Sequence, residues 1–272
     1  MPVTTDTAAA QEPAADSLEA RIQTSERFAE ALAQDQFMLF AQPIAPLRED
    51  RKGRRHLEIF VRFREEEEHL LPPGTFFPIL EANGLTPQLD RWEVGKVLQW
   101  AADKRQKKID WRVPTFAINL AEDTLEDEDF AAHVFASLTE SHIPPDRLWF
   151  EITVTQFTGM REAAARTIAD LSGLGCAVAL SDFAGGEAEA KDCAGSGVKL
   201  VKLAGGLLRD IETNPKVMSA LVATNTACHK VGLQTIAQFV ETTETLTLVR
   251  RAGLDYAQGF RVAMPVPLSL LS

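Results

Sequence analysis

Residues 199–240 indicate the fold class most directly, with the sequence KLVKLAGGLLRDIETNPKVMSALVATNTACHKVGLQTIAQFV. It opens with the short apolar run KLVKLAG and closes with a second one, QTIAQFV. Between them, NPKVMSALVATNTACHKVGL repeats its apolar residues with a period of about 3.6, which is typical of a helix. Parallel strands need a long crossover connection, usually a helix, so the stretch predicts a parallel β-α-β unit.

The same alternation continues over most of the chain. Further runs rich in β-branched and aromatic residues predict strands that begin at Phe37, Leu57, Thr115, Leu148, Ala177 and Tyr256. About eight strands alternating with helices over roughly 230 residues favour an α/β fold, a modified TIM-like (β/α)8 barrel. The connection LREDRKGRRH between the first two strands is too short for a helix, so we expect that pair to be antiparallel.

The flanking segments have different compositions. Residues 1–17 lack large apolar side chains and are predicted to be a disordered extension. Residues 18–36 place Leu18, Ile22, Phe28 and Leu32 at helical spacing, which predicts a leading amphipathic helix and a contact for a homodimer. Residues 37–272 then form the barrel domain. The acidic run Glu65–Glu68 predicts a solvated loop tip after the second strand.

Composition narrows the function classes. A formal net charge of -11 argues against duplex nucleic acid as a partner, because phosphate binding needs a surplus of Lys and Arg. Cys176, Cys193 and Cys228 have no paired spacing, so we expect neither a disulfide framework nor a zinc site. No stretch stays apolar for the ~20 residues that a membrane span needs, and the start lacks the pattern of a secretory signal. We therefore expect a cytoplasmic protein.

Isolated polar side chains stand at or near the ends of nearly all predicted strands. In a barrel these C-terminal strand ends meet at one face, where functional groups gather. A polar group within an apolar strand is costly unless it is paired or used. Each one alone is explained as well by a structural network, but their occurrence on successive strands predicts a shared site. The candidates are Glu58, Arg62, Asn119, Glu151, Thr153, Asp182, Lys202, Gln238, Glu241 and Gln258.

Nine short strings, in a fixed order, carry a family resemblance. They are QPI at Gln42, EIFVR at Glu58, LPPGTFFPILEANGL at Leu71, INLA at Ile118, LWFEIT at Leu148, SDFAGG at Ser181, VKL at Val201, IAQFVET at Ile236 and AQGF at Ala257. From about Phe37 to Leu268 the sequence resembles EAL domains, the cyclic di-GMP phosphodiesterase barrels of bacteria. One such string is weak evidence, whereas nine in order are strong.

The resemblance implies a site for two metal ions and a nucleotide. EAL phosphodiesterases linearise cyclic di-GMP with two Mg²⁺ or Mn²⁺ ions, which are hard cations that require oxygen ligands. The positions that match metal ligands are Glu58, Asn119, Glu151 and Asp182. The positions expected to bind the nucleotide are Gln42, Arg62, Asn119, Asp182, Lys202 and Gln258. The positions that match the catalytic machinery are Glu58, Lys202 and Glu241.

Several acids of the family pattern are replaced. Ser181 stands in place of the first of two paired aspartates, Gln238 in place of the glutamate of an AEG string, and Val154 in place of the second acid of EITE. Ala204 replaces an aspartate that follows the lysine. Losing carboxylates leaves too little negative charge to hold two dications. The resemblance therefore predicts a degenerate site with negligible turnover, no required cofactor and only weak Mg²⁺ or Mn²⁺ binding.

Three functions stay open on the sequence. The first is a receptor that binds cyclic di-GMP without hydrolysing it and regulates a protein partner. The second is a protein-interaction module that no longer binds nucleotide. The third is a weak residual metal-dependent phosphodiesterase. The fold alone does not choose between them.

Overall fold

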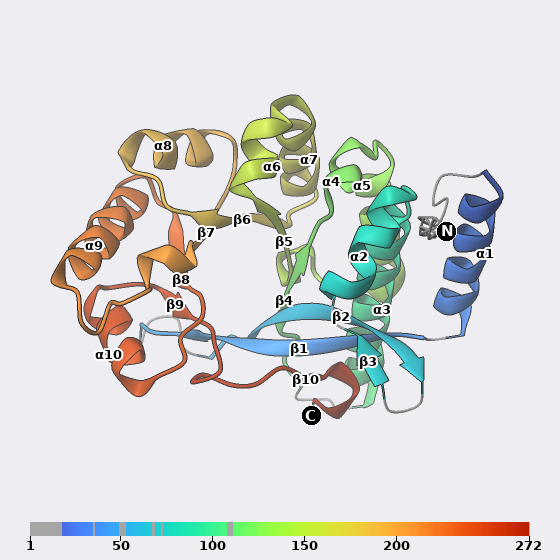
Figure 1. Cartoon of the computed structure of the whole chain (residues 1–272), viewed down its shortest axis with the longest axis horizontal. Helices are drawn as coiled ribbons and strands as arrows, with labels where there is room; N and C mark the ends of the chain where they lie inside the picture. Colours follow the sequence, from blue (N-terminus) through green and yellow to red (C-terminus); the bar gives the residue numbers. More distant parts are fainter. Residues whose placement is uncertain are drawn as a thin grey trace, which may run out of the picture.

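The computed structural model describes residues 18–34, 36–48, 53–66, 69–71, 73–107 and 111–271, and it contains a closed barrel (Figure 1). The hydrogen-bonded order is β1–β9–β8–β7–β6–β5–β4–β2, and β2 pairs again with β1. This confirms the predicted TIM-like barrel. The strands of the barrel are β1 (Phe37–Pro46), β2 (His56–Glu66), β4 (Thr115–Asn119), β5 (Leu148–Thr153), β6 (Ala177–Phe183), β7 (Leu200–Leu203), β8 (Gln234–Ala237) and β9 (Tyr256–Ala257).

The first strand runs against both of its neighbours in the barrel. β1 pairs antiparallel with β2 from Phe37↔Phe63 to Ile44↔His56, and antiparallel with β9. This confirms the antiparallel start expected from the short connection. Two additional strands were not predicted, namely β3 (His69–Leu71) and β10 (Val266–Pro267). Because β2 continues through Glu66, the prediction of a loop over Glu65–Glu68 is wrong at Glu65 and Glu66, and Glu67 and Glu68 lie outside the described residues.

Helices follow most of the strands. They are α1 (Leu18–Ala33), α2 (Pro73–Ala82), α3 (Thr86–Lys107), α4 (Glu122–Glu126), α5 (Phe130–Ser141), α6 (Val154–Gly159), α7 (Arg161–Gly173), α8 (Glu187–Gly195), α9 (Pro215–Lys230) and α10 (Thr243–Arg251). In α9 the side chain of Asn214 accepts from the backbone N–H of Lys216 and Pro215 takes the first turn, so the boundary is set locally. The extension predicted over 1–17 lies outside the described residues. No helix in the described ranges is long and apolar enough to cross a membrane.

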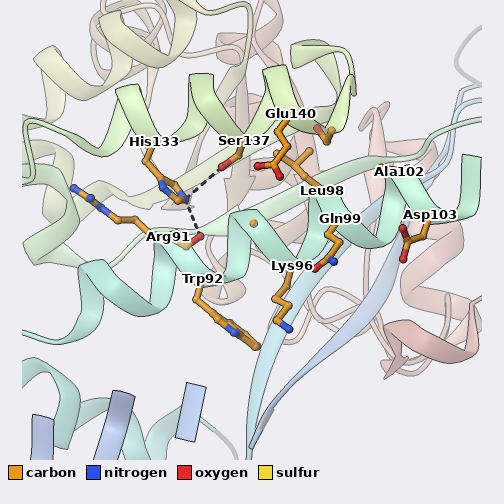
Figure 2. Close-up of a pocket in the computed structure, with 12 residues that line it drawn as sticks. Arg91, Trp92, Lys96, Leu98, Gln99, Ala102, Asp103, His133, Ser137 and Glu140 are labelled. Atoms are coloured by element: carbon orange, nitrogen blue, oxygen red, sulfur yellow. Dashed lines mark hydrogen bonds between the residues drawn. The ribbon is translucent and has the colours of Figure 1, made fainter. Parts of the chain in front are cut away.

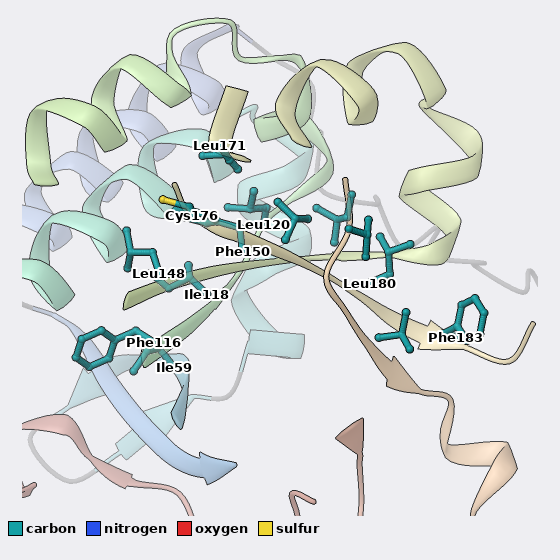
Figure 3. Packing of buried hydrophobic residues seen from close by; sticks show 14 of the residues in the cluster. Ile59, Phe116, Ile118, Leu120, Leu148, Phe150, Leu171, Cys176, Leu180 and Phe183 are labelled. Carbon is teal, nitrogen blue, oxygen red and sulfur yellow. The ribbon is translucent and has the colours of Figure 1, made fainter. Parts of the chain in front are cut away.

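Alternation along the strands builds two separate apolar layers. Phe116, Ile118 and Phe150 point outward and pack beneath the helices (Figure 3). Ala117 and Trp149 point inward and fill the barrel, because successive side chains of a strand face opposite sides. At the N-terminal end of the strands His56 stacks on Trp149, with ring centroids 4.6 Å apart. The interior is therefore packed at this end, and inward-facing polar groups occur at the other.

Candidate functional site

Lys202 on β7 lies at the centre of a buried charged cluster inside the barrel. Its side chain is 1% exposed, and its Nζ lies 2.7 Å from Glu58 Oε2 on β2 and 2.6 Å from Glu151 Oε2 on β5. All three side chains face inward because their register partners belong to the interior layer, namely Ala117, Ala179 and Ile236. One ammonium therefore bridges two carboxylates from β2 and β5, strands that β4 separates in the barrel.

Three side-chain amides complete the cluster. Asn119 Nδ2 donates to Glu58 Oε1 at 3.0 Å, and Gln258 Nε2 donates to Glu58 Oε2 and, at 3.1 Å, to Gln42 Oε1. Gln42 Nε2 donates in turn to the carbonyl of Ala263 at 2.9 Å. The structure thus connects six of the predicted site residues by hydrogen bonds and ion pairs. They are Gln42, Glu58, Asn119, Glu151, Lys202 and Gln258.

The three ionisable groups of the cluster have pKa values shifted in different directions. Burial alone would raise the pKa of Glu58, but Lys202 and the amide donors outweigh it and lower that pKa. Burial raises the pKa of Glu151 to about 7, the charge of Glu58 adds to this, and Lys202 opposes it only in part. Burial would lower the pKa of Lys202, but the two carboxylates together raise it. Lys202 is therefore held as an ammonium and Glu58 as a carboxylate, and these two charges offset each other within the cluster.

Arg62 occupies a different environment at the end of β2. Its guanidinium carbon lies 5.7 Å from the ring centre of Phe40 and 5.8 Å from that of Phe60. Its Nη1 donates to the carbonyl of Val61 at 2.9 Å, which uses one of the five donors of the group. Partial burial lowers the pKa of Arg62, yet arginine stays charged at any physiological pH. Arg62 is therefore a cation held by two rings, with donors left for a phosphate.

A small cavity of about 200 Å³ opens above the cluster. It is lined by Gln42, Glu58, Phe60, Gln238, Phe239, Glu241, Gln258, Gly259 and Phe260. The side chains of Phe239 and Phe260 are 65% and 57% exposed, which is unusual for such large apolar groups. The cavity therefore combines polar groups at its base with two open aromatic faces at its rim.

Phe239 is held in a conformation that favours glycine. Its φ is +56°, in the left-handed region, which costs free energy for a residue with a side chain. The next residue, Val240, holds this segment in place through two backbone hydrogen bonds. Its N–H donates to Gln258 O, and its carbonyl accepts from Arg261 N–H, both at 2.9 Å. Gly259 permits this approach, since a Cβ there would lie 2.3 Å from the backbone of Val240. Sequence reasoning missed Phe239, although AQF replaces both the Glu and the Gly of the AEG string.

Other predicted residues stand apart from the cluster. Asp182 is exposed and has a φ of +59°, and Glu241 is exposed at the rim of the cavity. Thr153 caps α6 instead of facing a ligand, since its Oγ1 accepts from Gln156 N–H while Gln156 Oε1 accepts from Thr153 N–H. Gln238 contributes a buried Nε2 that finds no hydrogen-bond partner among the residues described.

Two buried acids on α3 were not predicted from the sequence. Asp90 Oδ2 accepts from Ala121 N–H at 2.9 Å and from Thr124 Oγ1 at 2.6 Å, and burial raises the pKa of Asp90 to about 7. Burial, with the charges of Asp90 and Glu58, raises the pKa of Glu93 well above its ordinary value. Glu93 therefore lies near enough to the barrel cluster for the charge of Glu58 to affect its pKa. Asp90 has a structural role at the start of α4.

A larger hollow of about 510 Å³ lies between α3 and α5 (Figure 2). The ring Nε2 of His133 lies 3.0 Å from the carbonyl of Arg91 and 3.5 Å from Ser137 Oγ. The guanidinium of Arg91 forms a bidentate pair with Asp127, which links α3 to the segment before α5. These contacts bind the helices to each other, so we assign the hollow a structural role.

Comparison with known proteins identifies the family. The family model of the EAL domain matches the sequence over residues 25–265, nearly all of the chain. The chain belongs to the EAL domain family. It is 30% identical over 254 residues to the cyclic di-GMP phosphodiesterase PdeF of Escherichia coli, covering 92% of this chain and 33% of PdeF. It is 28% identical over 243 residues to PdeB of Shewanella oneidensis, covering 89% of this chain and 28% of PdeB. The chain thus spans about a third of the length of these relatives.

Solved EAL domains have the same fold. The FimX EAL domain of Xanthomonas citri, in complex with cyclic di-GMP, superposes with a TM-score of 0.81 at 24% identity, over 93% of this chain and 97% of that one. The FimX EAL domain of Pseudomonas aeruginosa, bound to cyclic di-GMP, gives a TM-score of 0.80 at 22% identity, over 89% and 95% of the two chains. At these identities the comparison establishes the EAL barrel fold.

The described side chains of this EAL domain are not arranged as a two-ion metal centre in this structure. The two inward acids, Glu58 and Glu151, already share Lys202. Ser181 is neutral, and its hydroxyl donates to the carbonyl of Ile152 at 3.5 Å. Within the described residues, no three or more His, Cys, Asp or Glu side chains are arranged to hold a metal ion. The donor set thus offers one paired carboxylate couple where two dications would need a dense oxygen cage.

Proposed function

We propose that this EAL domain is a receptor that binds cyclic di-GMP without hydrolysing it and transmits the signal to a protein partner. The observation that carries the proposal is the position of Lys202, whose ammonium lies within 2.7 Å of both inward carboxylates. It supplies internally the positive charge that a metal ion would otherwise supply. Metal-assisted activation of water requires open coordination positions, which these paired carboxylates do not provide.

The same charge pairing removes the main obstacle to an anionic ligand. Unpaired carboxylates at the mouth would repel the phosphates of a cyclic dinucleotide. With Lys202 between them, its positive charge offsets part of their negative charge. The guanidinium of Arg62 has donors left to pair with a phosphate.

The rim of the cavity suits the bases of the ligand. Phe239 and Phe260 present exposed rings beside polar groups, and purines stack on such rings. The donors and acceptors of Gln42 and Gln258 lie in the same cavity wall. EAL domains solved from Xanthomonas citri and Pseudomonas aeruginosa are described with cyclic di-GMP bound, which supports this class of ligand. We expect a cytoplasmic receptor with no required cofactor, at most weak Mg²⁺ or Mn²⁺ binding, and a homodimer contact through α1.

Titration calorimetry with cyclic di-GMP tests the proposal. The receptor binds in EDTA, and binding changes little when Mg²⁺ or Ca²⁺ replaces EDTA. Arg62→Ala should weaken binding by about tenfold to a hundredfold, the value of a charge-assisted phosphate contact. Arg64→Ala is the matched control, because Arg64 lies two residues further along β2, is exposed, and carries the same charge.

Three results would contradict the receptor. Absence of heat in every buffer would favour an interaction module without nucleotide. Binding that appears only with a divalent ion would favour a residual metal site. Chromatography that detects linear dinucleotide at about one turnover per second with Mn²⁺ would show an active phosphodiesterase, since typical turnover numbers begin near that value.

A further inference from the structure

The described side chains of the leading helix α1, residues 25–33, pack on the barrel through Phe28, Ala31 and Leu32. Phe28 and Ala31 are 4% and 3% exposed, and they join a cluster with Phe37, Val61 and Phe76. The other described side chains between 25 and 33 are exposed or half-buried. In Figure 1 the helix stands at the edge of the molecule. The docking of this part of α1 can therefore be lost without unfolding the whole domain.

Helix α1 docks on the outer face of the β1–β2 ribbon, and the inner face of the same ribbon carries candidate ligand residues. Side chains of the β1–β2 ribbon alternate between two faces, and Phe37 pairs in register with Phe63 on the outer one. Gln42 pairs with Glu58 on the inner face, to which Arg62 also belongs. The same two strands therefore carry the docking surface of α1 outside and three candidate ligand residues inside.

Aromatic rings lie on both faces of the ribbon, and Phe63 and Arg62 are neighbours in β2. The ring of Phe37 lies 5.6 Å from that of Phe28 and 5.0 Å from that of Phe63, centre to centre. Phe63 follows Arg62 directly in β2, and the guanidinium of Arg62 rests between Phe40 and Phe60 on the inner face. A close-packed ring cluster does not deform freely, so displacement of Phe28 shifts the ribbon rather than leaving a void.

We propose that docking of α1 and ligand binding at the barrel mouth are thermodynamically linked, which makes α1 a regulatory helix. This rests on the proposed binding of cyclic di-GMP. With α1 docked, the ribbon holds Gln42 and Glu58 in the hydrogen-bonded chain with Gln258, so docking favours the binding-competent arrangement. Linkage is reciprocal, and the ligand must favour docking of α1 by the same factor by which docking favours the ligand.

Two measurements test the linkage. Calorimetry compares Phe28→Ala, which removes the docking ring, with Arg27→Ala, an exposed neighbour on the same helix. We expect Phe28→Ala to weaken cyclic di-GMP binding at least about fivefold, Arg27→Ala to leave it unchanged, and Phe28→Leu to restore most of the affinity. Hydrogen exchange on the unaltered protein, which does not depend on any variant folding, should show that the ligand slows exchange of amides 25–33.

The outcomes separate the two proposals. If the unaltered protein gives no heat with cyclic di-GMP, the proposed function fails and the linkage fails with it. If the unaltered protein binds, but Phe28→Ala binds equally well or the exchange of α1 is the same with and without ligand, only the linkage is overturned. A change in both, by similar factors, supports it.

Discussion

Replacing Lys202 by methionine tests whether its ammonium is what makes the buried carboxylates tolerable. Nζ lies 2.7 and 2.6 Å from the carboxylates of Glu58 and Glu151, and all three side chains are almost fully buried. Removing one partner of a buried ion pair costs about 3–5 kcal/mol, because the remaining charge is uncompensated. We expect Lys202→Met to lose this much stability at pH 8. Methionine is similarly long and flexible, so the loss comes from charge rather than from a cavity.

Glu151→Gln is the matched comparison from the same cluster. Burial raises the pKa of Glu151 to about 7, and the nearby Glu58 adds to this shift. Replacing Glu151 by glutamine leaves the pair of Lys202 and Glu58 intact. We expect a cost below about 1.5 kcal/mol, the value of a hydrogen bond rather than of an ion pair.

The loss in Lys202→Met should also depend on pH in a defined direction. Without the ammonium, burial raises the pKa of both Glu58 and Glu151. The folded state then binds protons that the unfolded chain releases above about pH 4.5, so stability falls as pH rises. The deficit is therefore small at pH 5 and full at pH 8. Urea unfolding followed by tryptophan fluorescence in EDTA measures it. A deficit that is independent of pH, or no larger than that of Glu151→Gln, would refute the argument.

Three other predictions follow from the same structure. Replacing EDTA by 1 mM Mn²⁺ should stabilise the protein by less than about 0.5 kcal/mol in urea unfolding, whereas a site of micromolar affinity would add about 4 kcal/mol. Burial raises the pKa of Asp90 to about 7, so its ionisation lowers the stability of the folded protein as pH rises from about 4 to 7. Asp90→Asn should remove this contribution and make the free energy of unfolding depend less on pH. Denaturant titrations at several pH values that give the same pH dependence for both proteins would contradict this. Phe239→Gly should change stability little, because relief of about 1–2 kcal/mol of left-handed strain offsets the lost ring contacts. Calorimetry should nevertheless show about 1–3 kcal/mol weaker binding of cyclic di-GMP, and equal affinity would exclude Phe239 as a base platform.

The fold was predictable because its signals are local. Runs of β-branched and aromatic residues located each strand of the barrel, and the short turn before His56 was enough to make the first pair antiparallel. The meeting of Glu58, Glu151 and Lys202 was also predictable in part. Each stands on a separate strand, and the barrel brings strand ends together.

The remainder depends on geometry that sequence periodicity does not contain. Thr153 was read as a site residue, but a capping box with Gln156 accounts for its polarity. Asp90 and Glu93 were overlooked because polar residues in a helix are ordinarily exposed, and only the packing of α3 shows that these two are buried. The left-handed backbone of Phe239 lies beside the close approach of Gly259 to Val240, a contact between the segments that follow the neighbouring strands β9 and β8.

The surviving acids of this EAL domain have a physical role that does not require catalysis. Without Glu58 and Glu151, Lys202 would be an isolated ammonium with 1% of its side chain exposed, which is as costly as the isolated carboxylates are. The ammonium and the carboxylates therefore stabilise one another, and removing Lys202 leaves the charge of Glu58 uncompensated. Acids that match metal ligands in the family are thus insufficient evidence of an enzyme. The lysine lies at ion-pair distance from both carboxylates, which supports the proposed receptor.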